Sequence, residues 1–207
     1  MRRARIILIA ALLSAPSWAA DEKLGLEVEA SIGPSWPSLT GLCNVEGCAV
    51  PPTVALRVGY ELVPFASVGL RGAAALGPQG RDFCPGPTLC DGSYRAWSIL
   101  VDGRLHTVGT TQLTFGAAFG LTRLISLQCQ CEEVYQATGS KLPTLEFALG
   151  GRTYLPGLPI HVGLEARYSA IFGAESGYAT EFGPPGRVSE RLVVSSIAVS
   201  FVVGTSL

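Results

Sequence analysis

Residues 161–172 read HVGLEARYSAIF, and polar and apolar side chains alternate along them with a period of two. In an extended strand, alternate residues share a face, whereas a helix would spread the same residues around its surface. One face of the strand would carry His161, Gly163, Glu165, Arg167 and Ser169, and the other would carry Val162, Leu164, Ala166, Tyr168, Ala170 and Phe172. The stretch therefore predicts a β-strand with a polar face and an apolar face.

The same alternation recurs in seven other stretches, which span residues 25–33, 53–63, 67–76, 93–105, 112–122, 144–154 and 191–203. Together with 160–172 they predict eight strands. Each is close to or above the length of about 9–11 residues that a tilted strand needs to cross a bilayer. No stretch after the N-terminal leader is apolar for long enough to predict a membrane helix.

The connections between the predicted strands alternate in length. Residues 34–52, 77–92, 124–140 and 173–190 form long connections, whereas 63–65, 106–110 and 155–159 form short ones. This alternation is typical of an up-and-down barrel whose two termini lie at the short-turn end. The sequence therefore predicts an all-β fold, an eight-stranded antiparallel up-and-down transmembrane β-barrel.

The polar faces of the predicted strands contain Gly, Ala, Ser and nearly balanced charges, with Arg but no Lys. Arg suits confined ion pairs with carboxylates, whereas Lys suits open water. An eight-stranded barrel has an interior that side chains can fill. We therefore expect the apolar faces to contact lipid and the charged side chains to plug the lumen: Glu27, Glu29, Arg57, Glu61, Arg71, Asp102, Arg104, Glu146, Arg152, Glu165 and Arg167. The alternative is a soluble secreted lipocalin-like binder, whose apolar faces would point inward.

The N-terminus has the features of a secretory signal peptide. Arg2, Arg3 and Arg5 precede the apolar run 6–13, and Ser17-Trp18-Ala19 fits the rule for a cleavage site. We expect residues 1–19 to be the signal peptide and 20–207 to be the barrel domain. Net charge is −1 and there is no basic run, so nucleic acid is not an expected partner.

This pattern of strands and connections resembles the small eight-stranded outer-membrane barrels of Gram-negative bacteria, the OmpA/OmpX-like family, over nearly the whole mature chain. The likeness is one of pattern, without a diagnostic motif. It implies location in the cell outer membrane, contact with outer-membrane lipids and lipopolysaccharide, and a monomer.

Six cysteines after a signal peptide imply an oxidising compartment and disulfides. Local spacing favours Cys43–Cys48 and Cys84–Cys90, which leaves Cys129 and Cys131, and a bridge across one residue would be strained. All six lie in the first three long connections. Thiolates also bind soft metals, but no His or second Cys pair is near Cys129, so neither a metal nor a cofactor is predicted.

The long connections offer the predicted recognition surface, because aromatic residues lie in or beside them: Trp36, Tyr94, Tyr135, Tyr178 and Phe182. We expect a structural role, or adhesion and interaction through these loops with an extracellular partner. A small pore or an outer-membrane lipid-modifying enzyme is the alternative. Such an enzyme would offer His and Ser on the lipid-facing surface, whereas His161 points inward and His106 is expected to be a solvated turn residue. No catalytic residue is therefore predicted.

Overall fold

The computed structural model of the chain describes residues 25–39, 50–77, 93–130, 134–178 and 191–206. Eight strands make up most of these residues: β1 (Leu26–Leu39), β2 (Pro52–Val63), β3 (Ala66–Leu76), β4 (Ser93–His106), β5 (Thr111–Gln130), β6 (Val134–Tyr154), β7 (Ile160–Tyr178) and β8 (Arg191–Ser206). Among the described residues, no helix is long and apolar enough to cross a membrane.

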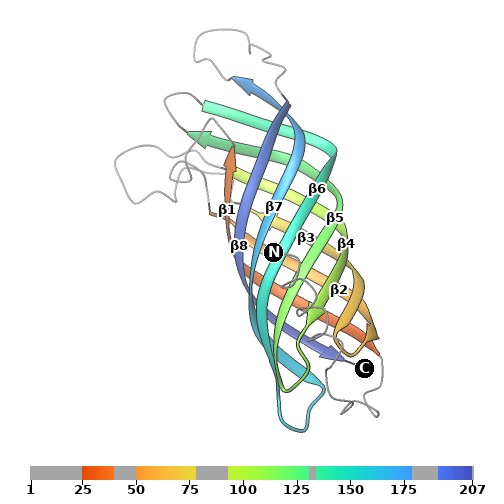
Figure 1. The fold of residues 1–207 in the computed structure, drawn as a ribbon. Coiled ribbons are helices and arrows are strands. Elements are labelled where there is room, and N and C mark those ends of the chain that lie inside the picture. Colours follow the sequence, from red (N-terminus) through yellow and green to blue (C-terminus); the bar gives the residue numbers. More distant parts are fainter. Residues whose placement is uncertain (1–24, 40–49, 78–92, 131–133, 179–190, 207) are drawn as a thin grey trace, which may run out of the picture.

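The strands form one closed barrel in which each pairs with its neighbours in the sequence. All pairings are antiparallel, and β1 pairs with β8 to close the barrel, with Glu27 opposite Ser206 and Leu39 opposite Val194. Figure 1 shows the tilted strands, with the short connections and the C-terminal end of β8 at the lower end of the view. The predicted eight-stranded antiparallel up-and-down barrel is confirmed.

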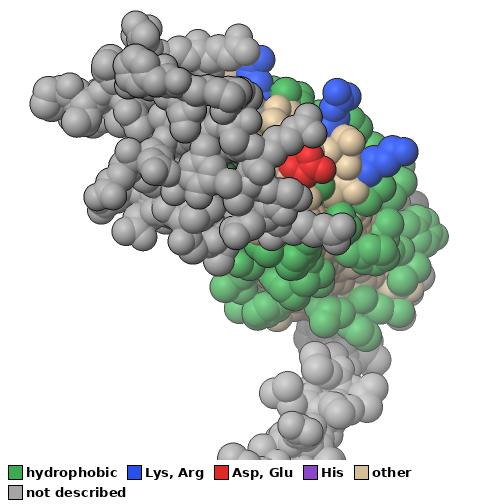
Figure 2. Space-filling view, turned by 90° about the horizontal axis from the view of Figure 1, so that it is seen from above, with side chains coloured by type: hydrophobic (Ala, Val, Ile, Leu, Met, Phe, Trp, Pro, Cys, Tyr) green, Lys and Arg blue, Asp and Glu red, His purple; other side chains and the backbone are tan. Residues whose placement is uncertain are grey.

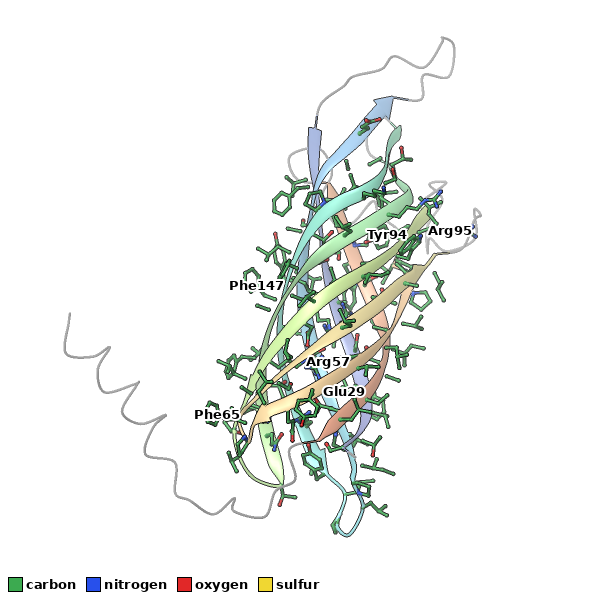
Figure 3. All side chains as sticks on the ribbon, turned by 90° about the vertical axis from the view of Figure 1, so that its right-hand side faces the viewer. Glu29, Arg57, Phe65, Tyr94, Arg95 and Phe147 are labelled. Carbon is green, nitrogen blue, oxygen red and sulfur yellow. The ribbon has the colours of Figure 1, made fainter. Side chains whose placement is uncertain are left out.

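The two faces of the strands are sorted as the alternation predicts. In β7, for example, Glu165 and Arg167 are buried inside the barrel, whereas Leu164 and Tyr168 are exposed on its outer wall. Figure 3 shows Phe65 and Phe147 projecting from the outside of the ribbon. We call the exposed side chains the apolar belt; it includes Leu56, Val58, Leu70, Ile99, Phe115, Phe119, Leu121, Leu149, Leu164, Ile197 and Phe201.

Several strands extend beyond their predicted ends. The expected long connection 124–140 is mostly strand, because β5 and β6 remain paired as far as Gln130 and Val134. Register shifts at 122–127 and 138–144 interrupt the two-residue period there, since a β-bulge adds residues to one strand of a pair. Cys129 therefore lies in β5, opposite Tyr135, and the prediction of a loop position for it is wrong.

The part of the lumen toward the long connections contains an apolar cluster. Its members come from β3 to β8: Ala75, Tyr94, Ala96, Leu124, Leu127, Ala137, Leu142, Ile171, Ala174 and Val194. Tyr94 is only 5% exposed, so the prediction that it belongs to a recognition surface in the loops is wrong. Its position in β4 points it inward, because Arg95 and Trp97 take the outer face.

Close contact between β4 and β5 requires a glycine at position 120. A Cβ atom there would lie 2.2 Å from the carbonyl oxygen of Ile99 and 2.8 Å from the Cα atom of Leu100, and both are backbone atoms. We expect Gly120→Ala to lower the free energy of unfolding by about 1–3 kcal/mol, as overpacking does. Urea titration of the folded protein in detergent micelles measures this change.

Gly72 provides the matched control, because a Cβ atom there would meet nothing within 4 Å. Gly72→Ala should leave the free energy of unfolding unchanged or raise it slightly, since alanine restricts the unfolded chain. Equal losses of stability in the two variants would contradict this account of the β4–β5 contact.

Candidate functional site

Ionisable side chains inside the barrel, between the apolar cluster and the short-turn end, form the candidate site. We call them the lumen network: Glu27, Glu29, Arg57, Arg71, Asp102, Arg104, Glu146, Arg152, His161, Glu165 and Arg167. Each is no more than 7% exposed. Figure 3 shows two members, Glu29 and Arg57, within the outline of the ribbon. Buried charges are tolerated only when they are paired and hydrogen-bonded, so the contacts of each one matter.

Arg57 of β2 joins three other strands. Its Nη1 donates to Oε2 of Glu27 at 2.5 Å, its Nη2 donates to Oγ of Ser67 at 2.8 Å, and its Nε donates to Asp102. Arg57 is only 2% exposed. The guanidinium group is planar and presents donors in a fixed fork, which lets one side chain connect β1, β3 and β4 across the lumen.

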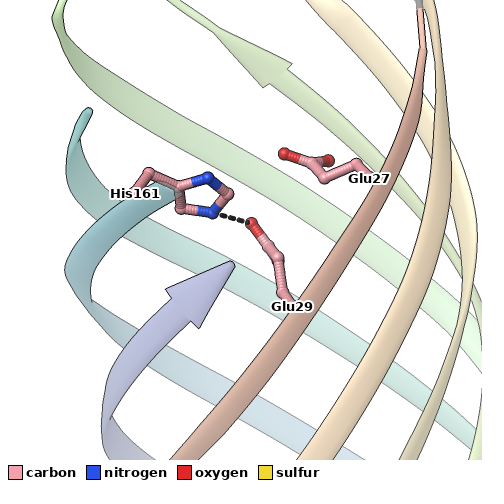
Figure 4. A group of neighbouring side chains, drawn as sticks. All are labelled: Glu27, Glu29 and His161. Atoms are coloured by element: carbon pink, nitrogen blue, oxygen red, sulfur yellow. Dashed lines mark hydrogen bonds and ion pairs between the residues drawn. The ribbon is translucent and has the colours of Figure 1, made fainter. Parts of the chain in front are cut away.

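Arg152 of β6 contacts both carboxylates of β1. It donates to Glu27, and its Nη1 also donates to Oε1 of Glu29 at 3.2 Å, while its Nε donates to Oε1 of Gln112 at 2.7 Å. Figure 4 shows the same part of β1 facing His161 of β7, whose Nε2 lies 3.1 Å from Oε1 of Glu29. Oε1 of Glu29 is therefore shared between a guanidinium and an imidazole.

Arg104 of β4 connects the two halves of the network. Its Nη1 donates to Oε2 of Glu29 at 2.5 Å, and its Nε lies 3.2 Å from Oδ1 of Asp102. Its Nη2 lies 3.5 Å from Oε2 of Glu165 on β7. The charges nearer the short turns are thus continuous with those nearer the apolar cluster.

The half toward the apolar cluster is centred on Glu146 of β6. Arg71 donates to both of its carboxylate oxygens, at 2.8 and 2.9 Å, and Arg167 donates to Oε1 at 2.7 Å. Arg167 also pairs with Glu165 of the same strand. Charge-assisted hydrogen bonds of this kind are shorter and stronger than those between neutral groups.

Glu61, the remaining predicted plug residue, lies at the edge of the network. Its Oε1 is 3.9 Å from Nη2 of Arg152 and 3.7 Å from Nε2 of His106. His106 is buried, so the prediction of a solvated turn residue is wrong. It is the last residue of β4, and its backbone N–H donates to the carbonyl of Phe65.

Three groups in the network have the chemistry of metal ligands. Oxygen atoms of Glu27 and Glu29 and a ring nitrogen of His161 lie within 4.8 Å of one another, all buried. Arg57 and Arg152 already contact these carboxylates, however, and their positive charges oppose a cation at the same position. The arrangement is that of an internal ion-pair network.

Spaces of different size lie on the two sides of the network. Toward the long connections is a cavity of about 50 Å³ lined mainly by hydroxyl-bearing and alanine side chains, with Arg71, Glu146 and Arg167 in its wall. Such a cavity is large and polar enough to hold water. At the short-turn end a wider space of about 420 Å³ is lined by Glu61, Gln112, Tyr154 and other residues.

The disulfide predictions concern positions that the structure mostly leaves undescribed. Cys43, Cys48, Cys84, Cys90 and Cys131 lie outside the described residues. They remain sequence-based predictions, as does the signal peptide at residues 1–19. Of the aromatic residues assigned to the loops, Tyr135 and Tyr178 lie opposite each other in β6 and β7.

Three members of the site are not apparent from charge alone. Ser67 and Gln112 accept hydrogen bonds from network arginines, and His161 contacts Glu29. The alternation places all three on inward faces, but it does not indicate their partners. Those depend on the stagger between strands far apart in the sequence.

No model of a known protein family matches the chain, and no curated protein sequence matches it. Solved structures do match. The crystal structure of neisserial surface protein A (NspA) aligns with a TM-score of 0.58 at 14% identity, covering 88% of this chain and 97% of that one.

Two weaker matches are the N-terminal barrel domain of Pseudomonas aeruginosa OprF and Ail, the attachment invasion locus protein of Yersinia pestis. The OprF domain aligns with a TM-score of 0.39 at 9% identity, covering 86% of this chain and 98% of that one. Ail aligns with a TM-score of 0.38 at 14% identity, covering 86% of this chain and 99% of that one. Because the sequence identity to neisserial surface protein A is only 14%, that likeness shows the fold alone. The chain therefore has the closed eight-stranded fold of the small outer-membrane barrels that its sequence pattern resembles.

Proposed function

We propose that this protein is an outer-membrane barrel with a structural role, which holds its long connections at the cell surface for adhesion or interaction. The observation that supports the proposal is that charged side chains are buried and large apolar side chains are exposed, the reverse of their distribution in a water-soluble protein. Charged residues such as Arg57 and Glu27 are buried, while Phe119 and Leu164 are 64% and 63% exposed. Water would not favour so many exposed large apolar side chains, whereas lipid would.

Closure of the barrel supports the same proposal. Unpaired backbone groups are costly in hydrocarbon, so only helices and closed barrels cross membranes. Here β1 pairs with β8 along its length, and the sheet has no free edge. The burial pattern opposes the lipocalin-like alternative, since that fold would bury the apolar faces that this barrel exposes.

The lumen network supports a plug rather than an open channel. Arg57, Arg104 and Arg152 reach across the lumen to carboxylates on other strands, and their side chains separate the two spaces described above. The two described histidines, His106 and His161, are both buried inside the barrel, so neither is placed to act on a lipid at the outer wall. We assign the protein no reaction.

The long connections would face the outside of the cell, as they do in bacterial barrels with short periplasmic turns. They join β1 to β2, β3 to β4 and β7 to β8 at the end opposite the short turns. The β5–β6 connection lies at the same end but is short, because β5 continues to Gln130 and β6 begins at Val134. The paired parts of β5, β6 and β7 continue past the apolar belt toward that end. A rigid barrel with connections gathered at one end suits presentation of a binding surface.

Membrane fractionation combined with gel electrophoresis tests the proposal. The full-length protein, expressed in a Gram-negative host, should be recovered in the outer-membrane fraction. It should migrate faster on a denaturing gel when unboiled than when boiled, because the closed barrel resists the detergent. Recovery in the soluble fraction without a shift on boiling would overturn the proposal.

A further inference from the structure

We propose that Arg95, Arg123 and Lys141 form a site on the outer wall that binds the phosphate groups of a glycolipid in the outer leaflet. We call these three residues the basic patch. The inference rests on the proposed function, because it requires the outer wall to face lipid and the long connections to face outward. It adds a ligand class and a location that the fold alone does not give.

The three side chains lie on the outer faces of three adjacent strands. Arg123 of β5 is exposed and is paired across the strands with Trp97 of β4, two residues from Arg95. On its other side, Thr122 pairs with Leu142 and Leu124 pairs with Gly139, which places Lys141 next to Arg123. Neighbouring strands are about 4.8 Å apart, so one phosphate could contact cations from two of them.

The distribution of positive charge singles out this patch. Arg57, Arg71, Arg104, Arg152 and Arg167 are buried in the lumen. Among the residues whose side chains are described, Arg95, Arg123 and Lys141 are the only Arg and Lys residues on the outer wall. Figure 2, which looks down on the end of the long connections, shows basic side chains beside the green apolar surface.

An acidic side chain also lies on the outer wall, beyond the patch. Glu175 of β7 is exposed and pairs with Thr138 of β6, which is three residues from Lys141. Within the described part of the chain, the strands that bear the patch, β4 to β6, have no acidic residue exposed on the outer wall. The three strands that bear the patch therefore contribute basic but no acidic side chains to it.

The backbone of β6 is bulged at the patch. Lys141 has a φ of 58°, the only positive φ among the described residues other than glycine, and such a conformation is uncommon outside glycine. The six steps along β6 from Thr138 to Thr144 are matched by only four steps along β7, from Glu175 to Ile171. Bulges change the direction of a side chain and are frequent at barrel rims.

The patch lies at the border of the apolar belt. Trp97 and Leu121 are exposed beside it on the side of the short turns, and Ile125 is exposed on the other side of Arg123. Tryptophan is enriched where a membrane meets water. A lipid whose acyl chains contact the belt would therefore place its headgroup at the level of Arg95, Arg123 and Lys141.

The chemistry of the patch favours phosphate. Arginine binds phosphate through two parallel N–H donors, and lysine adds a compact positive charge. Arg95 is held in place by a hydrogen bond from its Nε to the carbonyl of Gly77, at 3.2 Å. The combination of an apolar wall and adjacent cations suits a phosphorylated glycolipid such as lipid A, which carries both acyl chains and phosphates.

The test is a binding titration of the full-length protein in neutral detergent with diphosphoryl lipid A. Dephosphorylated lipid A and inorganic phosphate serve as comparison probes. The wild type should bind diphosphoryl lipid A at least about tenfold more tightly than the dephosphorylated lipid, since charge-assisted contacts are involved. Arg123→Glu/Lys141→Glu should remove this preference, whereas Arg123→Lys/Lys141→Arg should keep it.

Thr111→Glu/Thr153→Glu is the matched control. It adds the same two carboxylates to β5 and β6, at an exposed pair near the short turns, and should leave lipid A binding unchanged. Equal binding of lipid A by the wild type and by Arg123→Glu/Lys141→Glu would overturn the site. Displacement of lipid A by millimolar inorganic phosphate would overturn its assignment to a lipid.

The electrophoretic test separates this inference from the proposed function. A protein that fractionates with the outer membrane and shifts on boiling, but has no preference for phosphorylated lipid A, would lack the site and keep the proposed function. A protein that fails to fractionate with the outer membrane would contradict the proposed function itself.

Discussion

Replacing Arg57 with Met should lower the free energy of unfolding by about 3–5 kcal/mol, the cost of breaking a buried ion pair from one side. Met removes the charge but keeps much of the length of the side chain. Glu27 and Asp102 would then remain buried, at 0% and 1% exposure, with Arg152 and Arg104 as their remaining partners. The loss would arise because the two carboxylates stay in the lumen with one cation fewer beside them.

Urea titration of the protein folded in lipid vesicles measures this effect, with the shift on unboiled gels as the readout of the folded barrel. Arg123→Met is the matched control, because it makes the same substitution at an exposed position. Surface substitutions usually change stability by less than about 0.5 kcal/mol. A similar loss in both variants would mean that Arg57 contributes through general packing and not through its ion pairs.

A second variant distinguishes charge from packing at the same position. Asp102 accepts a hydrogen bond from Arg57 and lies close to Arg104 as well. Adding Asp102→Asn to Arg57→Met removes the charge of one carboxylate that Arg57 contacts, so the double variant should lose less stability than the sum of the two single variants. Residues within one network show such coupling, of about 0.5–3 kcal/mol. Strict additivity would contradict the network.

Much of the barrel could be predicted from sequence because the period of a strand is two. In 161–172 this period alone separates Glu165 and Arg167 from Leu164 and Tyr168, and the structure keeps that separation. The alternating connection lengths then fix the topology of consecutive antiparallel strands. Neither inference requires knowledge of distant contacts.

The ends of the long strands could not be predicted in the same way. Bulges near Arg95, Arg123, Lys141 and Gly173 shift the alternation, so the pattern fades while the backbone pairing continues. Leu127, Ala137 and Ala174 lie beyond the bulges of β5, β6 and β7, out of step with the inward residues before them, and all three pack inside the barrel. Hydrogen bonds between backbones hold strands together regardless of side-chain pattern.

The partners within the lumen are also beyond sequence reasoning. Arg71 and Glu146 are 75 residues apart, and Arg152 and Glu27 are 125 apart. Which charges meet depends on the stagger of the strands around the barrel, and a change of one residue in the register would exchange partners. The sequence indicates that pairing is needed but does not assign the pairs.

Replacing Ala117 with Arg should destabilise the barrel in a lipid bilayer by about 2–4 kcal/mol, as a basic residue does at the midplane of a membrane barrel. Ala117 is exposed on the outer wall of β5, midway between Leu113 and Leu121 of the apolar belt. Alanine contributes little to packing there, so the loss would arise from placing a charge in hydrocarbon.

Thr111→Arg makes a comparable change at the start of the same strand, where the outer wall meets the short turns. The cost near a membrane interface is only about 0–1 kcal/mol. The two variants, unfolded by urea in lipid vesicles, should therefore differ in their free energy of unfolding by at least about 1 kcal/mol. A further variant, Ala117→Leu, should be nearly neutral because it keeps the position apolar.

The same comparison decides which solvent the outer wall meets. In water, an arginine at an exposed position is favourable, since charged groups prefer solvent to an apolar surface. Ala117→Arg would then be neutral or stabilising, and no dependence on position along β5 would be found. A loss at Ala117 that exceeds the loss at Thr111, and that disappears for leucine, is expected only if hydrocarbon surrounds the belt. That result would connect the alternation in the sequence directly to the environment in which the protein folds.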